Sequence, residues 1–288
     1  MRLYLFLPVG IVAISTASIF IKLCEAPALV IAAYRLALAS LLLLPWAAYR
    51  KVWRNWTGVE WRWLILSGVF LALHFAFWIA SLKFTSVASS VVLVSTNPLF
   101  VGLGASMFFK EPLRPTLILG ILLSVAGSGL ISFGDVALSK EALMGDGLAL
   151  LGAVAASGYL LVGRKMRKGQ DLLSYIFPVY STGAILLTLI SLAFQKPFFG
   201  YPPVTYLFLF LLAVVPQLIG HTTFNWALKY LPASMVAIAI LGEPVGSTIL
   251  AFFILGETLT FLKVIGGLLI LTGILTALRQ PKAIPPED

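Results

Sequence analysis

Glu243 is a carboxylate inside a long apolar segment, directly before Pro244. The nearest charged residues, Lys229 and Glu257, are each fourteen positions away, which on a helix corresponds to roughly 20 Å. Removal from water favours the protonated form of a carboxylate, and ionisable groups inside a membrane usually mark a transport pathway. We expect Glu243 to bind an amine or to carry a coupling proton. The alternative is a neutral carboxyl group that hydrogen-bonds to a neighbouring helix.

The two histidines of the chain, His74 and His221, are further candidates for polar groups in a cavity. Four-residue spacing places Trp78 on the helical face of His74, and it places Gln217 and Asn225 on the face of His221. We expect both faces to line a cavity, and a histidine satisfied within the helix core is the equally weighted alternative. Neither histidine has the local ligand cluster that a metal site needs, so no metal is expected.

Arg35 and Tyr159 are two more polar groups within apolar segments. Arg35 has the chemistry to anchor an anionic group of a substrate, but arginine also snorkels or forms structural pairs. We favour the structural role for Arg35. Tyr159 supplies a candidate cavity hydroxyl.

Pro98 and Pro244 lie near the middle of two apolar segments and directly follow Asn97 and Glu243. Proline removes a backbone donor and leaves the carbonyl four residues earlier without its helical partner. In lipid, such a carbonyl is tolerated only where protein or a water-filled cavity satisfies it. We therefore expect a hinge or a cavity wall at these prolines, with a packing kink as the alternative.

The composition that surrounds these residues is that of an integral membrane protein. Hydrophobic residues make up 60% of the 288 positions and charged residues only 11%, whereas soluble domains have about 25% charged residues. The net charge is +9, but the basic residues lie in short gaps between apolar runs and form no basic face. No nucleic-acid partner is therefore expected.

Runs of about 18 or more apolar residues predict an all-α fold of ten transmembrane helices. The predicted helices cover residues 3–23, 28–49, 62–82, 86–109, 115–134, 146–163, 173–194, 204–227, 232–255 and 261–278. Lys and Arg concentrate on one side, about fourteen against five, so both termini are expected in the cytoplasm and the protein in the cell (inner) membrane. No Walker A, HExxH or nucleophile–base motif is visible, so neither ATP drive nor enzymatic activity is expected.

The sequence also repeats itself at an offset of 146 positions. STNPLFVGLGASMFFKEPL then aligns with LGEPVGSTILAFFILGETL, so Pro98 meets Pro244 and Asn97 meets Glu243. The same offset pairs Glu111 with Glu257, which we expect to have structural roles beside helix N-termini, and aligns the glycines of the fifth and tenth helices, which we expect to allow close packing. Because each copy holds five helices, the second copy is predicted to be inverted in the membrane, as in many secondary transporters.

These two segments resemble the paired EamA domains of the drug/metabolite transporter superfamily, and GDGLALLGAVAASGYLLVGRKM resembles the start of an EamA domain. The resemblance covers about residues 3–278. It implies a first repeat at 3–134 and a second at 146–278. Residues 279–288 are expected, from their prolines and charges, to form a polar cytoplasmic tail. It also implies export or exchange of small metabolites through a central cavity, formed largely by the first, third and fourth helices of each half.

Our leading hypothesis is a secondary exporter or exchanger that works by alternating access. An amino acid or similar zwitterion is the preferred substrate, mainly from the resemblance, and no cofactor is expected. Arg35 is the one cation deep in a predicted span, which counts against phosphorylated substrates. The expected partners are the metabolite, the lipid bilayer and a coupling proton, and a homodimer is left open. The alternatives are a passive channel or lipid flippase and, less favoured, a membrane-embedded enzyme.

Overall fold

The computed structural model describes residues 2–56, 60–85, 87–111, 114–133, 140–256 and 258–278. All regular structure within these ranges is helical. Eight helical segments there are long and apolar enough to cross a membrane, and two shorter apolar stretches cover Pro115–Gly127 and Val264–Ala277. The chain is therefore an all-helical, multi-pass membrane protein. Glu257 and the predicted tail at 279–288 lie outside the described residues.

Most helix bounds follow the predicted spans closely, but α7 is longer than predicted and three predicted spans are interrupted. In chain order the elements are α1 (Arg2–Leu23), α2 (Ala28–Arg50), the 3₁₀-helix η1 (Val52–Asn55), α3 (Glu60–Ser81), α4 (Val87–Val94), α5 (Asn97–Phe109), α6 (Pro115–Phe133), α7 (Lys140–Arg167), α8 (Leu172–Ala193), α9 (Pro203–Leu212), the π-helix η2 (Ala213–His221), α10 (Thr222–Ala227), α11 (Ala233–Ile240), α12 (Gly242–Leu255) and α13 (Phe261–Leu278).

Helix α7 is much longer than the predicted span 146–163. Its first turn contains Glu141, and its last turn contains Arg164, Lys165 and Arg167. A prediction based on runs of apolar residues leaves these charged turns out. They are nevertheless favourable in a helix, because acidic residues at its start and basic residues at its end complement the helix dipole. Glu111, expected to have a structural role, forms an ion pair of 3.4 Å with Arg164.

Two predicted helices are broken beside their prolines. The predicted span 86–109 is divided between α4 and α5, and the span 232–255 is divided between α11 and α12. Pro98 and Pro244 each lie in the first turn of the second half-helix. The break therefore precedes each proline, because the first turn of a helix has no intrahelical partner for an N–H group and tolerates its loss.

The predicted helix 204–227 also differs from a regular α-helix. Its middle part, η2, is a π-helix that contains Pro216 and ends at His221. Segments of π-helix are rare and often lie at functional sites. The four-residue spacing used to place Gln217 and His221 on one face applies to an α-helix, and it does not hold through this wider turn.

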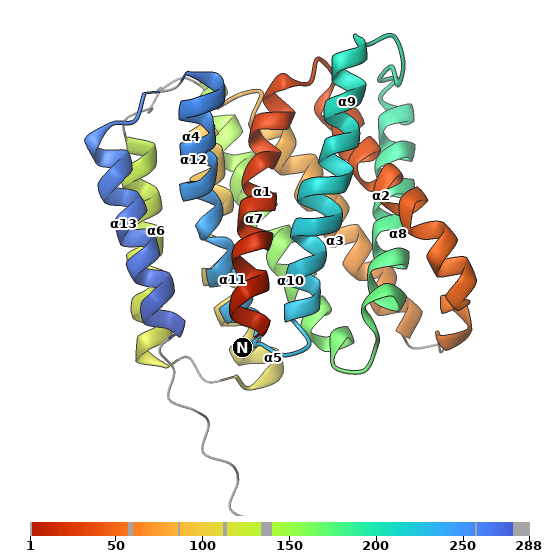
Figure 1. The fold of residues 1–288 in the computed structure, drawn as a ribbon, viewed down its shortest axis with the longest axis horizontal. Coiled ribbons are helices and arrows are strands. Elements are labelled where there is room, and N and C mark those ends of the chain that lie inside the picture. The colour runs from red at the N-terminus through yellow and green to blue at the C-terminus, as the bar shows by residue number, and fades with distance from the viewer. Residues whose placement is uncertain are drawn as a thin grey trace, which may run out of the picture.

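The helices form one bundle in which α1 and α7 lie near the middle, and the broken helices lie between them and one edge (Figure 1). At one edge α6 lies beside α13, and toward the other edge α2 lies beside α8. The start of α1 and the end of α13 are at the same end of the bundle. This arrangement surrounds the polar residues of α2, α3, α7, η2 and α12 with apolar helices.

Close packing of α6 against α13 depends on glycine. A Cβ atom at Gly127 would lie 2.5 Å from the Gly266 carbonyl oxygen, and one at Gly120 would lie 2.7 Å from the Gly273 carbonyl oxygen. Ser124 Oγ donates a hydrogen bond of 3.3 Å to the Ile270 carbonyl at the same interface. Small residues of this kind allow helix backbones to approach each other in a membrane.

Asp171 caps helix α8, where its carboxylate accepts hydrogen bonds of 3.1 Å from the backbone N–H groups of Leu173 and Ser174. Partial burial raises the pKa of Asp171, but the hydrogen bonds and the charge of Arg167 outweigh it, so the pKa is lowered overall. A carboxylate with a lowered pKa stabilises the folded state above its unfolded pKa, and this contribution is lost as the pH falls through the folded value.

We expect Asp171→Ala to lower the stability by about 1 kcal/mol at neutral pH, because it removes the cap. The deficit should shrink as the pH falls below about 4, because the unfolded carboxylate then takes up a proton and the native one follows only as the pH falls through its lowered pKa. Thermal unfolding in detergent at several pH values measures both effects. Asp171→Asn keeps a capping oxygen and is the matched control. An alanine deficit that does not change with pH would contradict a charged cap.

Candidate functional site

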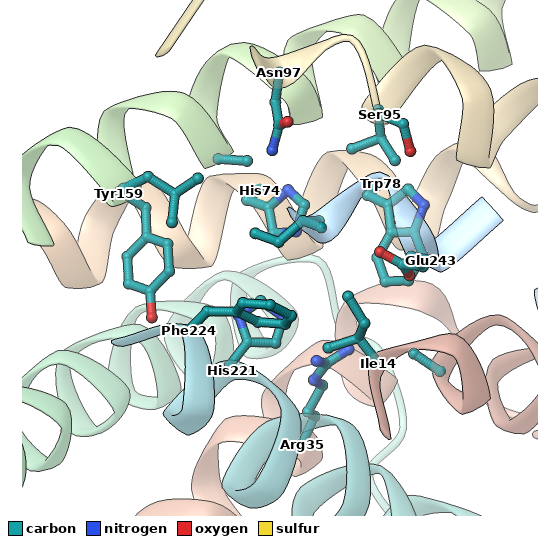
Figure 2. Close-up of a pocket in the computed structure, with 15 residues that line it drawn as sticks. Ile14, Arg35, His74, Trp78, Ser95, Asn97, Tyr159, His221, Phe224 and Glu243 are labelled. Carbon is teal, nitrogen blue, oxygen red and sulfur yellow. The ribbon is translucent and has the colours of Figure 1, made fainter. Parts of the chain in front are cut away.

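A cavity lies at the centre of the bundle, where α1, α2, α3, α7, η2 and the broken helices meet (Figure 2). Its volume is about 50 Å³, which gives room for a few water molecules. The wall consists of Ile14, Ala17, Arg35, His74, Trp78, Val94, Ser95, Asn97, Ala156, Tyr159, Leu160, His221, Phe224, Ile240 and Glu243.

Most of the residues predicted from the sequence meet at this cavity. Those in its wall are Arg35, His74, Trp78, Asn97, Tyr159, His221 and Glu243. The other four predicted residues are not in the wall. Pro98 and Pro244 are buried in the first turns of their half-helices, and Gln217 and Asn225 are buried where they hydrogen-bond to wall residues.

Glu243 points into the cavity from the first turn of α12 (Figure 2). A helix N-terminus carries a partial positive charge and unpaired N–H groups, so it favours a carboxylate at this position. Helix α12 also packs closely on α1, where Ser15 Oγ donates to the Glu243 carbonyl oxygen at 3.4 Å. The broken helix therefore positions the carboxyl group at the inner wall of the bundle.

Arg35 is completely buried in α2. One part of its guanidinium group contacts other side chains, and another part has no hydrogen-bond partner among the described residues. Its Nε donates a hydrogen bond of 2.9 Å to Gln217 Oε1, and its Cζ lies 4.0 Å above the ring centre of Phe75. Its Nη1 is buried and has no hydrogen-bond partner among the described residues. Arg35 thus has the structural contacts that we favoured and also retains an unused donor at the cavity.

The two histidines face each other across the cavity, with ring centres 6.4 Å apart. His74 stacks on Trp78 at 5.9 Å with an interplanar angle of 3°. His74 Nδ1 lies 3.0 Å from the Gly152 carbonyl oxygen. Because a carbonyl only accepts, Nδ1 is the donor, and in a neutral ring Nε2 remains available as an acceptor.

Gln217 and Asn225 support wall residues from behind. Asn225 Nδ2 donates to the hydroxyl oxygens of Tyr159 at 2.5 Å and Tyr180 at 3.2 Å, while Gln217 binds Arg35. The three residues predicted to share one helical face are therefore separated: His221 lies at the cavity, and the amide side chains of Gln217 and Asn225 lie behind the wall. The π-helical turn, together with the burial of both amides, accounts for this difference from the expected single face.

Several buried polar atoms of the wall lack a hydrogen-bond partner among the described residues. Arg35 Nη1 and Trp78 Nε1 are unpaired donors, and Asn97 Oδ1 is an unpaired acceptor. A buried polar atom without a partner costs free energy. A ligand with both an anionic acceptor and a donor would satisfy this set.

Ser95, Phe224 and Ile14 also line the cavity and were not selected from the sequence. Ser95 lies at the break between α4 and α5. The sequence feature that could have identified it is its position three residues before Pro98. Phe224 and Ile14 resemble many other apolar residues of the chain, so no local pattern distinguishes them.

Comparisons with known proteins match nearly the whole chain. Residues 1–133 and 143–279 match the profile of the EamA-like transporter family. An uncharacterized transporter of Archaeoglobus fulgidus is 31% identical over 273 residues, which cover 91% of this chain and 92% of the relative. The uncharacterized transporter YyaM of Bacillus subtilis is 27% identical over 215 residues, which cover 72% of this chain and 70% of YyaM. A protein of known crystal structure superposes with a TM-score of 0.79 over 96% of both chains at 20% identity and therefore shares the fold.

Proposed function

The chain belongs to the EamA-like transporter family, and from this premise we propose that it is a secondary transporter of a small zwitterionic metabolite such as an amino acid. The observation that carries the proposal is the presence of an unused Arg35 donor and the Glu243 carboxyl group in the wall of one small cavity. Arginine matches the fork of a carboxylate, and a carboxylate is the natural partner of an ammonium group.

The rest of the wall fits this ligand class. Asn97 Oδ1 supplies another acceptor for an ammonium group, and Trp78 Nε1 supplies another donor for a carboxylate. Aromatic rings of His74, Tyr159 and Phe224 form a less polar part of the wall for a side chain. Glu243 either binds the ammonium group directly or carries a proton that is exchanged during the transport cycle.

We further propose that ten spans form two inverted repeats, 3–134 and 146–278, that rock around this cavity. The α6–α13 interface supports this proposal. Ser124 hydrogen-bonds to Ile270, its own counterpart at the repeat offset of 146. At the same offset Gly266 is the counterpart of Gly120, and Gly127 is the counterpart of Gly273. The Gly120–Gly273 contact and the Gly266–Gly127 contact are therefore equivalent in the repeat. A two-fold axis through the interface produces this pattern.

The proposed orientation places both termini in the cytoplasm and the chain in the cell membrane. The start of α1 and the end of α13 lie at one end of the bundle (Figure 1). The basic ends of α2 and α7 carry Arg50, Arg164, Lys165 and Arg167, and the cytoplasmic ends of membrane helices are enriched in Lys and Arg.

Counterflow in proteoliposomes tests the proposed function. Vesicles that contain the purified protein are loaded with an unlabelled amino-acid mixture, and uptake of individual labelled amino acids is measured from outside. A carrier should accelerate uptake of its own substrate when loaded, because the loaded site returns faster. Uptake that is equally fast in empty vesicles would indicate a pore, and movement of labelled lipid without amino-acid uptake would indicate a flippase.

A further inference from the structure

We propose that a groove on the surface of the bundle, between α3, α5 and α7, binds an anionic phospholipid. The groove has a volume of about 600 Å³ and is separate from the central cavity. Its apolar part is formed by Leu66, Phe70, Phe108, Gly158 and Leu161. Its charged end is formed by Lys165 and Lys168 beside Trp63. This site does not depend on the identity of the transported molecule.

The apolar part offers an acyl chain an apolar surface along α3 and α7. Trp63, Leu66 and Phe70 share one face of α3, and on α7 the groove extends from Lys165 to Gly158. Seven residues of α-helix span about 10 Å, so the groove extends about that far from the lysines. A Cβ atom at Gly158 would lie 2.7 Å from the Phe70 ring, so this glycine lets the ring lie against α7 as the floor.

The charged end has an excess of positive charge. Lys165 and Lys168 are both exposed, and in the described parts of the chain neither forms an ion pair, while the nearby Glu111 is already paired with Arg164. Lys165 Nζ lies 3.6 Å from the centre of the Trp63 ring. A cation–π contact holds the ammonium group in place without neutralising its charge, so both lysines remain available to a phosphate.

Together these parts complement a lipid with one phosphodiester and an extended chain. Basic pockets between membrane helices bind anionic headgroups in this way, and tryptophan is enriched at the level of the headgroups. A zwitterionic lipid brings its own ammonium group toward the two lysines and is therefore disfavoured. The geometry thus favours a phosphatidylglycerol-type lipid over phosphatidylcholine.

Native mass spectrometry of the full-length protein tests the site. The protein is equilibrated with equal amounts of phosphatidylglycerol and phosphatidylcholine in detergent, and the lipids that remain bound are counted. We expect the wild type to retain phosphatidylglycerol preferentially. The double variant Lys165→Gln/Lys168→Gln should reduce this preference by about tenfold or more. The matched control Lys51→Gln/Lys229→Gln removes the same charge from exposed residues outside the groove and should keep the preference.

The double variant Lys165→Arg/Lys168→Arg provides a second test, because it keeps both charges and should retain the anionic lipid. Equal retention of the two lipids by the wild type would overturn the proposal by showing an apolar groove without headgroup selection. So would an unchanged preference in the glutamine variant, or an equal loss in the control. If the glutamine variant does not fold, the wild-type preference and the arginine variant decide the question.

Discussion

Glu243→Gln is expected to reduce substrate transport by about tenfold to a hundredfold. The substitution keeps the size of the side chain but removes the charge, and a hydrogen bond to a charged group contributes about 1.5–3 kcal/mol. Glu243 points into the central cavity (Figure 2), so the proposed function makes the lost interaction one with the substrate or with a coupling proton. Initial uptake rates in proteoliposomes, with and without an imposed pH gradient, measure the effect.

The two roles of Glu243 give different results in this experiment. If the carboxylate binds the ammonium group of the substrate, the apparent affinity should fall in both uptake and counterflow. If it carries a coupling proton, the neutral variant should lose its response to the pH gradient while counterflow continues. Glu141→Gln makes the same chemical change at an exposed residue in the first turn of α7 and should transport normally. An unchanged rate with unchanged gradient dependence in the Glu243 variant would falsify both roles.

Gly127→Ala is expected to lower the stability by about 1–3 kcal/mol, the usual cost of overpacking a well-packed core. The new Cβ atom would lie 2.5 Å from a backbone carbonyl oxygen of α13 and 2.9 Å from the backbone nitrogen of Ile270. A flexible side chain moves away at little cost, but here the backbone of α13 has to shift. The unfolding temperature in detergent measures the loss.

Gly129→Ala is the matched control, because Gly129 is on the same helix and a Cβ atom there would have no heavy atom within 4 Å. Alanine is a better helix former than glycine by up to about 1 kcal/mol. This control is therefore expected to be neutral or slightly stabilising. If both variants unfold at the same temperature, close packing at Gly127 does not contribute to the stability of the α6–α13 interface.

Much of the fold follows from the sequence, because a membrane span requires a long apolar run and few other segments meet that requirement. The predicted bounds of α1, α6 and α13 differ from the observed ones by a residue or less. The family resemblance is confirmed by the match to the EamA-like transporter family. The charged turns of α7 were missed because a criterion based on apolar residues stops where a helix leaves the apolar layer.

Residues of the candidate site could be predicted where an ionisable side chain lies in an apolar helix, because burying such a side chain costs free energy. Glu243, Arg35 and His74 stand out for this reason, and they meet at one cavity. Residues that line the cavity with ordinary apolar side chains, such as Phe224, give no such signal. The position of Gln217 behind Arg35 could not be predicted either. It depends on a π-helical segment, and no motif in the sequence indicates that segment.

His221 ends the π-helix, and it is not the exact counterpart of His74 in the repeat. At the offset of 146 the counterpart of His74 is Gly220, yet His221 is the residue that faces His74. Gly220 instead packs against Ile14, where a Cβ atom would lie 2.5 Å from a side-chain carbon. An alignment of the two halves at this offset therefore does not pair the two histidines that meet at the cavity, although it does pair Asn97 with Glu243. The direction in which each helix turns its side chains decides which residues of the two halves face each other, and only the three-dimensional structure shows it.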